Sequence, residues 1–310
     1  MPDVGLLTEQ SAVRSLELGE VRLTYVVDGA MALTPAGFFP GVPPEHWSRH
    51  PETLDRDGRV AMSAGGLMVE RGGRRLLIDA GLGDITATMA INGSPIGTSN
   101  CGALPETLSA LGRRPADFEV VAFTHLHGDH TGWAFVPDDD RRYRKFFPDA
   151  RYVVAAEEWA PHARGETVPG APTRAAVIDP LASVVTPIDD GAEIFPGVRA
   201  LLAPGHTPGH TAYVISTSAG RLIVFGDAFH IPAQLAHPDW PSKPDTDARA
   251  VIAARRRLIA ELEQPGTLGF SYHFGDQSFG RVVRDGDGLA GWEPVPTTTL
   301  LPPPRRLRDR

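Results

Sequence analysis

Cysteine is almost absent from this chain of 310 residues, which contains only Cys101. A single cysteine cannot form a disulfide within the chain, and it cannot supply the several thiolates of a cysteine-ligated metal cluster. Proteins without disulfides are typical of reducing compartments. The cysteine content therefore favours a cytoplasmic protein that is not stabilised by internal cross-links.

Long hydrophobic runs are also absent. No stretch approaches the roughly 20 apolar residues that span a bilayer, and residues 1–7 lack the basic start and the apolar stretch of a secretory leader. We therefore expect no association with a membrane.

Positively charged residues are fewer than negatively charged ones: the chain has 30 Lys and Arg residues and 38 Asp and Glu residues, which gives a formal net charge of -8. Such a chain has no overall positive field to hold phosphate backbones, so nucleic acid is not an expected partner. The basic cluster at the end follows three prolines and is typical of a solvated terminus; it contains Arg305, Arg306, Arg308 and Arg310. Residues 301–310 are therefore predicted to form a flexible tail rich in Pro and Arg.

The remaining composition is that of an ordinary globular domain. Hydrophobic residues make up 42% and charged residues 22% of the chain, close to the averages for folded domains. No low-complexity linker divides the chain, and the candidate site residues come from both halves. We therefore predict an N-terminal arm over residues 1–20 and a single domain with mixed α/β layers over residues 21–300.

Short apolar runs bounded by turn residues predict the elements of this domain. Strands are expected at residues 21–27, 66–70, 74–78, 120–123, 198–202, 212–216, 221–225 and 269–272. Helices are expected at residues 105–111, begun by Pro105 and ended by Gly112, and at about residues 245–263, with apolar side chains on one face. The dipeptide Gly72-Gly73 predicts a tight hairpin.

Glycines and prolines between residues 29 and 44 predict a long loop, which carries Phe38 and Phe39 and is followed by Trp47. A loop of this length in a compact domain is often functional. Its aromatic side chains either line a pocket or tie the loop to the core. We expect this loop, residues 90–98 and Trp133 to shape the pocket.

A histidine-rich segment after the strand at residues 120–123 predicts a metal site. It reads Thr124-His125-Leu126-His127-Gly128-Asp129-His130. Imidazoles and carboxylates are the ligands of zinc-like metals, whereas the same groups buried as plain structure would each need a hydrogen-bond partner. Gly128 lets the loop turn so that the side chains aim at one point.

Two metals need more ligands than this segment holds, and other predicted strand ends supply them. His206 and His210 lie between two strands, Asp227 follows a third strand, and His273 follows the last one. Because α/β scaffolds usually expose their chemistry at the C-terminal ends of strands, we expect these residues to converge at one rim.

With this pattern the chain resembles the metallo-β-lactamase superfamily. The pattern is His125-x-His127-x-Asp129-His130, then His206, Asp227 and His273, with Leu77-Ile78-Asp79-Ala80-Gly81 upstream. The resemblance implies a four-layer αβ/βα sandwich with two metals in a cleft at the edge of two facing sheets. It also implies that one metal is held by His125, His127 and His206 and the other by Asp129, His130 and His273, with Asp227 bridging them.

Asp227, where other members have cysteine or serine, is similar to the dinuclear hydrolases of the superfamily, such as lactonases and glyoxalase II. The segment Gly226-Asp227-Ala228-Phe229-His230 resembles the branch of methyl parathion hydrolase and related lactonases. His230 departs from the tyrosine of many acyl-homoserine lactonases. The implied cofactors are two divalent transition-metal ions, zinc first, with iron, manganese or cobalt as alternatives.

The implied reaction is the opening of a lactone or ester, acyl-homoserine lactones included, by a metal-bridging hydroxide. Asp129 is the candidate for proton handling, Asp227 for bridging the metals, and His230 for donation to the substrate oxygen. The alternatives are a phosphotriester or aryl-ester hydrolase, then a β-lactamase, then a non-catalytic metal-containing sensor or binding module. The expected partner is a small-molecule ester or lactone, and the oligomeric state is open, a homodimer included.

The remaining histidines have other expected roles. His210 is predicted, together with Asp79, to orient the metal ligands. His46, His50 and His162 are predicted to be solvated, and His237 is left as a structural residue.

Overall fold

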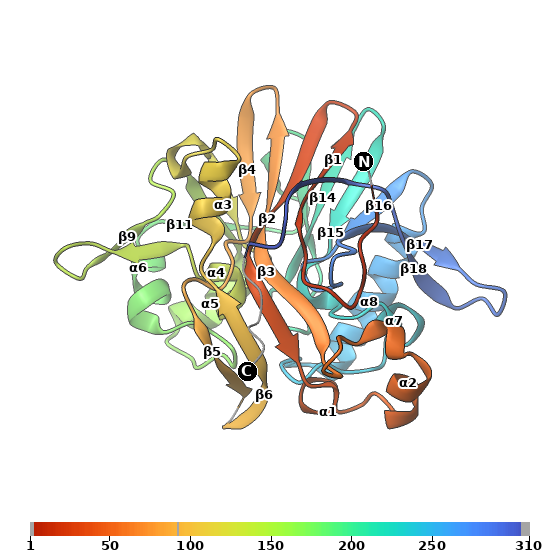
Figure 1. The fold of residues 1–310 in the computed structure, drawn as a ribbon. Helices are drawn as coiled ribbons and strands as arrows, with labels where there is room; N and C mark the ends of the chain where they lie inside the picture. Colours follow the sequence, from red (N-terminus) through yellow and green to blue (C-terminus); the bar gives the residue numbers. More distant parts are fainter. Residues whose placement is uncertain (1–2, 92, 305–310) are drawn as a thin grey trace.

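Two sheets face each other in the middle of the molecule, and helices lie outside them (Figure 1). The computed structural model describes residues 3–91 and 93–304. Within these residues, no helix is both long enough and apolar enough to cross a membrane.

The first sheet has ten strands in the order β11-β10-β7-β4-β3-β2-β1-β19, with β6 paired to β2 and β5 paired to β6. The strands are β1 (Val13–Leu18), β2 (Val21–Leu33), β3 (Val60–Arg71), β4 (Arg74–Ile78), β5 (Thr86–Ile91), β6 (Ser94–Cys101), β7 (Val120–Ala122), β10 (Arg151–Ala155), β11 (Val185–Ile188) and β19 (Thr298–Leu301). The neighbours β4, β7, β10 and β11 run parallel. The chain therefore leaves β7 and β10 at the same edge of the sheet.

The second sheet has seven strands in the order β12-β13-β14-β15-β16-β17-β18. They are β12 (Glu193–Phe195), β13 (Val198–Leu202), β14 (Thr211–Thr217), β15 (Gly220–Val224), β16 (Thr267–Phe270), β17 (Phe279–Arg284) and β18 (Ala290–Pro294). Only β15 and β16 pair in parallel, so both end at one edge. A separate hairpin joins β8 (Phe135–Pro137) to β9 (Tyr143–Lys145).

The alternation of side chains along each strand separates an inner core from two outer ones. In β2, Tyr25 packs into the core between the sheets, while its neighbour Val26 packs on the outer face. In β15, Val224 points inward and Ile223 outward in the same way. The ring of Tyr25 meets Phe270 of β16 edge-on, with centroids 5.2 Å apart. The inner core therefore joins the two sheets.

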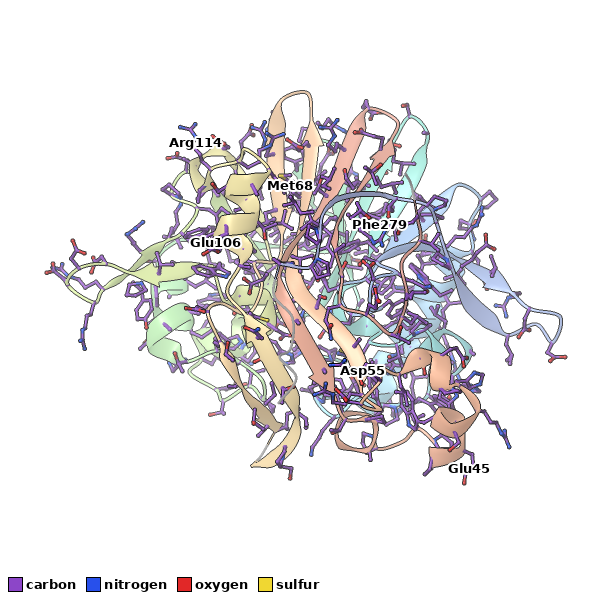
Figure 2. The ribbon with its side chains drawn as sticks, in the orientation of Figure 1. Glu45, Asp55, Met68, Glu106, Arg114 and Phe279 are labelled. Atoms are coloured by element: carbon purple, nitrogen blue, oxygen red, sulfur yellow. The ribbon has the colours of Figure 1, made fainter. Side chains whose placement is uncertain are left out.

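Helices cover the outer face of each sheet. The longer ones are α2 (Pro44–Arg49), α3 (Leu104–Ala110), α5 (Ala156–Ala163) and α8 (Ala248–Leu262), and the short ones are α1 (Pro35–Phe38), α4 (Gly128–Thr131), α6 (Asp179–Ala182), α7 (Ala233–Ala236), η1 (Pro51–Thr53), η2 (Pro115–Asp117), η3 (Arg174–Ile178) and η4 (Gly226–Ala228). Met68 and Phe279 are buried, whereas Glu106 of α3 and Arg114 are exposed; all four are labelled in Figure 2. The order helix, sheet, sheet, helix confirms the predicted αβ/βα sandwich.

The helix α8 shows how local sequence places an outer element. Asp247 caps its first turn by accepting hydrogen bonds from the backbone N–H groups of Arg249 and Ala250, at 2.9 and 3.0 Å. Leu258 and Leu262 lie on the buried face against the second sheet. The predicted helix at residues 245–263 is confirmed, although it begins after the cap.

The predicted loop at residues 29–44 was wrong in its first part, because β2 continues to Leu33. A bulge between Val27 and Gly29 shifts the register, and the strand then pairs with β6. A Cβ atom at Gly29 would lie 2.4 Å from the Cα of Cys101. This glycine therefore permits a close approach of two strands and does not end the strand. Within residues 90–98, which were expected to shape the pocket as a loop, residues 90–91 belong to β5 and residues 94–98 to β6, and these two strands pair.

The first and the last strands of the described chain, β1 and β19, are neighbours in the first sheet. Part of the predicted arm forms β1, which pairs with β2 and with β19. The division into arm, domain and tail stays a prediction. The basic cluster of Arg305, Arg306, Arg308 and Arg310 lies outside the described residues.

Candidate metal centre

The candidate ligands follow strands that end at one edge of the sandwich. The histidine-rich segment leaves β7 of the first sheet, and His206 lies in the turn between β13 and β14. Asp227 lies in η4, directly after β15, and His273 follows β16. Because β15 and β16 are parallel neighbours, Asp227 and His273 arrive side by side.

These side chains form two clusters that share one carboxylate. The first contains His125, His127, His206 and Asp227, and the second contains Asp129, His130, Asp227 and His273; within each cluster the donor atoms lie within 4.8 Å of one another. All are buried except Asp129, which is partly exposed. The structure therefore brings together all seven predicted ligands, while their binding of metal stays a prediction.

The outer nitrogens of these rings show which nitrogen faces the centre. The Nδ1 atom of His206 lies 2.9 Å from a carboxylate oxygen of Asp245, and that of His130 lies 2.9 Å from Asp79. An ionised carboxylate only accepts hydrogen bonds, so each Nδ1 donates. In the neutral ring the inner Nε2 then carries a lone pair.

The same logic holds for two more rings. His273 Nδ1 donates to the backbone carbonyl of Ser63 at 3.1 Å. The hydroxyl of Thr124 donates to Asp79 at 2.8 Å, so its oxygen is free to accept from His125 Nδ1 at 3.0 Å. The Nε2 lone pairs of these rings therefore also point inward.

The inward lone pairs of the neutral rings face carboxylate oxygens, an arrangement that a cation between them would stabilise. Nε2 of His130 and Nε2 of His273 both lie 3.1 Å from Oδ1 of Asp227. Nε2 atoms of His125, His127 and His130 are buried and have no hydrogen-bond partner among the described residues. Buried polar atoms are rarely left unpaired, and imidazole with carboxylate is the donor set of divalent transition metals. The residues fit a divalent-metal site.

The electrostatics of the centre point the same way. Burial opposes a charge on His206, but Asp227 and Asp245 outweigh it and raise the pKa of this ring to about 9. Burial lowers the pKa of His127 to about 3 and that of His210 to about 3, with neighbouring imidazoles adding to the effect. The carboxylates thus attract positive charge, while these two rings stay neutral.

Comparison with known families agrees with this geometry. A family model of the metallo-beta-lactamase superfamily matches residues 66–278. The chain belongs to this superfamily. Its matched region contains all seven candidate ligands, from His125 to His273.

Solved structures of the superfamily share this fold at low sequence identity. AidC, a dizinc quorum-quenching lactonase in complex with a homoserine product, has a TM-score of 0.77 and 22% identity over 93% of this chain and 98% of its own. The hydrolase AbOPH has a TM-score of 0.73 and 20% identity over 93% and 98%. AiiA of B. thuringiensis, with N-decanoyl-L-homoserine at its active site, has a TM-score of 0.62 and 17% identity over 85% and 94%. These similarities show the fold.

Asp79 holds two of the candidate ligands in place, as predicted. Its backbone has a positive φ of 62°, which a residue other than glycine rarely adopts. In this conformation its carboxylate accepts hydrogen bonds from the backbone N–H and the hydroxyl of Thr124, as well as from His130. One carboxylate therefore orients both His130 and, through Thr124, His125.

His210 orients the backbone of Asp227 and is not itself part of either cluster. Its Nε2 accepts the backbone N–H of Asp227 at 3.0 Å, and its Nδ1 lies 3.1 Å from the carbonyl of Ala203. Gly226 has a positive φ of 53°, and a Cβ atom there would lie 2.5 Å from His210 Nε2. A glycine is needed at this position because the ring packs directly against it.

Two buried carboxylates that the sequence did not reveal join the ligand loops. Glu158 of α5 accepts hydrogen bonds from the backbone N–H groups of Leu126 and Gly209 and from the hydroxyl of Thr207. It therefore ties the histidine-rich segment to the loop of His206. Asp245 is the other, and neither stands in a recognisable motif.

His230 lies at the centre but outside both clusters. Its Nε2 is 3.0 Å from Oδ2 of Asp227, and its ring stacks parallel to that of His273, with centroids 5.6 Å apart. Burial, opposed by the charge of Asp227, lowers its pKa. The structure thus brings His230 beside Asp227, while its donation to a substrate stays a prediction.

The histidines that were expected to be solvated differ from one another. His50 is exposed, but His162 is 3% exposed, so the prediction for His162 was wrong. It lies in α5, where its ring stacks near Trp159 with centroids 6.2 Å apart. His46 is partly buried, and His237 stacks on Trp240 with centroids 4.0 Å apart, in keeping with a structural role.

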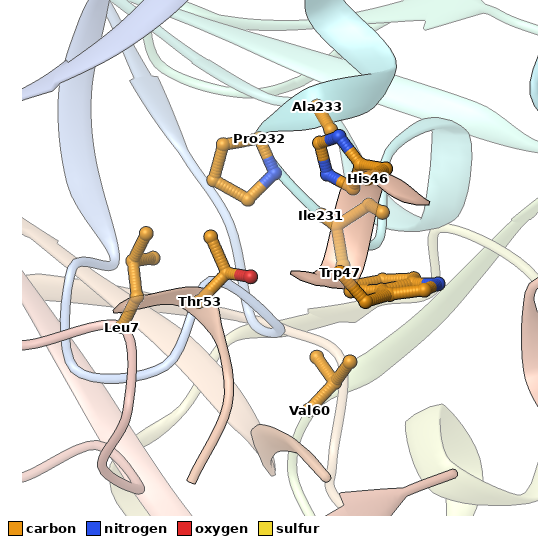
Figure 3. Close-up of a pocket in the computed structure, with 8 residues that line it drawn as sticks. All are labelled: Leu7, His46, Trp47, Thr53, Val60, Ile231, Pro232 and Ala233. Carbon is orange, nitrogen blue, oxygen red and sulfur yellow. The ribbon is translucent and has the colours of Figure 1, made fainter. Parts of the chain in front are cut away.

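The aromatic residues expected in a loop are divided between core and pocket. Phe38 and Phe39 are buried, and their rings lie 5.1 and 6.4 Å from the ring of His230. Trp47 lines a small apolar pocket of about 20 Å³ with Ile231 (Figure 3). The two phenylalanines therefore tie this segment to the core beside the centre, and Trp47 borders a pocket.

Proposed function

We propose that this chain is a dinuclear metal-dependent hydrolase that opens a lactone or ester. The observation that carries the proposal is the convergence of seven donor side chains, from both sheets, on two clusters that share Asp227. Imidazole lone pairs converging on a carboxylate would repel one another without cations between them.

The residues divide between two cations as the superfamily pattern implies. His125, His127 and His206 would hold one, and Asp129, His130 and His273 the other, with Asp227 touching both. When bound, such a pair of cations lowers the pKa of a water molecule and polarises a carbonyl oxygen.

The chain's own residues would handle protons. Asp129 is the most exposed member of the centre, with 21% of its side chain accessible, and its carboxylate lies 3.7 Å from His130 Nε2. This position lets it take a proton from the attacking water and pass it to the leaving group. His230, neutral and buried beside Asp227, would donate a hydrogen bond to the substrate oxygen as that oxygen becomes negative.

A lactone or ester is the favoured substrate class, acyl-homoserine lactones included. Among the similar structures, AidC is named a lactonase, and AiiA holds N-decanoyl-L-homoserine at its active site. The other open substrates are phosphotriesters, aryl esters and β-lactams. A cytoplasmic location belongs to the same proposal, while the oligomeric state stays open, a homodimer included.

The test combines metal analysis with turnover. The purified protein is expected to contain about two transition-metal ions per chain, and removal of these ions by a chelator is expected to abolish turnover of lactones and aryl esters. A panel with a phosphotriester, a penicillin and a carbapenem separates the alternative substrates.

The variant Asp227→Ala is expected to remove both metal and turnover, whereas the exposed Asp149→Ala serves as a matched control with both retained. Full turnover by a verified metal-free protein would refute the proposal. Tight capture of an unreacted ligand, with no hydrolysis across the panel, would instead favour a sensor or binding module.

A further inference from the structure

His230 is held from both sides by groups whose hydrogen-bonding roles can be worked out. Its Nδ1 lies 2.9 Å from the hydroxyl oxygen of Ser242, and its Nε2 lies 3.0 Å from Oδ2 of Asp227. The side chains of all three residues are buried. Which ring nitrogen carries the proton depends on whether Ser242 donates or accepts.

Gln234 decides this question, because its amide orientation is determined by backbone groups. Its Oε1 lies 2.8 Å from the backbone N–H of His230 and 3.3 Å from that of Ile231, and both of these groups can only donate. Its Nε2 lies 3.0 Å from the backbone carbonyl of Trp240, which can only accept. The oxygen and nitrogen of the amide therefore cannot be exchanged.

The second N–H of this amide is directed at Ser242. Gln234 Nε2 lies 3.0 Å from the Ser242 hydroxyl oxygen, which accepts this hydrogen bond. The hydroxyl hydrogen of Ser242 is then free to donate to His230 Nδ1. A neutral ring that accepts at Nδ1 carries its proton at Nε2, and Nε2 is the nitrogen that faces the acceptor Asp227.

We propose that Gln234 and Ser242 are positioning residues that hold His230 as the tautomer protonated at Nε2, so that an N–H group points into the reaction centre. This inference rests on the proposed function, and it assigns His230 a donor role towards a substrate oxygen that gains negative charge, as in lactone or ester opening. The opposite tautomer would present a lone pair to that oxygen and repel it.

The segment that carries Ser242 is itself firmly held. Arg255 of α8 is fully buried and donates to the backbone carbonyls of Ala228, Pro238 and Trp240. The backbone N–H of Ser242 donates to Asp245 at 2.8 Å. The backbone of Ser242 is therefore held in place relative to His230, and its hydroxyl contacts both Gln234 and His230, as a tautomer-setting group requires.

The test reads the tautomer directly. In zinc-loaded protein containing ¹⁵N-labelled histidine, the signals of His230 are identified by their loss in His230→Gln, and their chemical shifts tell which nitrogen is protonated. The wild type is expected to show a protonated Nε2 and a hydrogen-bonded, unprotonated Nδ1. In Ser242→Ala the Nδ1 signal is expected to shift, and kcat to fall about 10- to 100-fold with the zinc content unchanged.

Ser242→Thr, which keeps a hydroxyl, is expected to restore the wild-type spectrum and turnover, and Ser183→Ala, at an exposed serine, is the control for the same atomic deletion. A proton on Nδ1 in the wild type would overturn the inference, as would a Ser242→Ala protein with unchanged kcat and His230 signals. A wild type that binds no metal and hydrolyses no substrate would overturn the proposed function instead, and the spectrum would still decide the tautomer.

Discussion

Asp245 accepts a hydrogen bond of 2.9 Å from Nδ1 of His206. Burial opposes ionisation of this carboxylate, but the hydrogen bond from His206 and the charge of Arg255 hold its pKa below the ordinary value. A carboxylate behind a metal-binding imidazole fixes the ring and raises its basicity. Asp245 therefore acts on the centre without belonging to either cluster.

The variant Asp245→Asn is expected to weaken metal binding about 10- to 100-fold, because an amide cannot hold the His206 Nδ1–H as strongly as a carboxylate. The affinity is measured by competition with a coloured chelator, which needs no substrate. Asp239→Asn, at an exposed position in the same segment, is expected to bind metal as the wild type does. Equal affinities in the two variants would contradict this role.

Glu158→Gln is expected to lower the free energy of unfolding by about 2–4 kcal/mol. The carboxylate accepts three hydrogen bonds in a buried position, and the amide NH₂ group would face donors instead. Urea unfolding of chelated protein measures the loss. The adjacent Glu157 is exposed, so Glu157→Gln is the matched control with little change. A loss no larger than that of the control would show that Glu158 is dispensable.

Glu20 gives the folded protein a dependence on pH. Hydrogen bonds from the hydroxyl and backbone N–H of Ser218, with the charge of Arg71, lower its pKa from 4.5 to about 2. A carboxyl with a lowered folded-state pKa stabilises the fold fully above the unfolded pKa, and this contribution is lost as the pH falls towards 2.

The melting temperature of Glu20→Gln is therefore expected to lie below that of the wild type at pH 7, with the difference shrinking steadily below pH 4.5. Thermal unfolding of both proteins at several pH values measures this trend. Glu9→Gln, which alters an exposed glutamate, is expected to show no such trend. A Glu20→Gln deficit that stays constant down to pH 3 would argue against the contact with Ser218.

Arg255→Met is expected to destabilise the fold by about 3–5 kcal/mol, since it leaves the buried charge of Asp245 without its partner, 3.2 Å away. Chemical unfolding measures this change. Arg257→Met alters an exposed residue on the same helix and is expected to be nearly neutral. Similar stabilities for the two variants would mean that Arg255 is not needed to balance Asp245.

The part of the site that the sequence predicts is the part encoded locally. The segment from His125 to His130 supplies four of the seven candidate ligands within one loop. His206, Asp227 and His273 each follow a strand that is recognisable in the sequence as a short apolar run. Because parallel strands end at a common edge, such residues can be expected to meet. Strands such as β4 and β13 have the predicted bounds for the same reason.

The supporting residues could not be predicted, because their roles depend on packing between distant segments. Glu158 lies 32 residues from Leu126, whose N–H it accepts, and Asp245 lies 39 residues from His206. The predicted strand ended at residue 27, short of the end of β2, because Gly29 was interpreted as the start of a loop. The residue that Gly29 packs against, Cys101, is remote in sequence. His162 was predicted to be solvated because nothing in the sequence around it, in α5, indicates a buried position.

The centre draws its donors from both halves of the sandwich: His125 follows a strand of the first sheet, and Asp227 follows a strand of the second. Cations bound by both residues would link the two halves of the sandwich. Separation of the two halves during unfolding would then be coupled to release of the ions. Bound metals would then also stabilise the inner core, in which Tyr25 of the first sheet packs against Phe270 of the second.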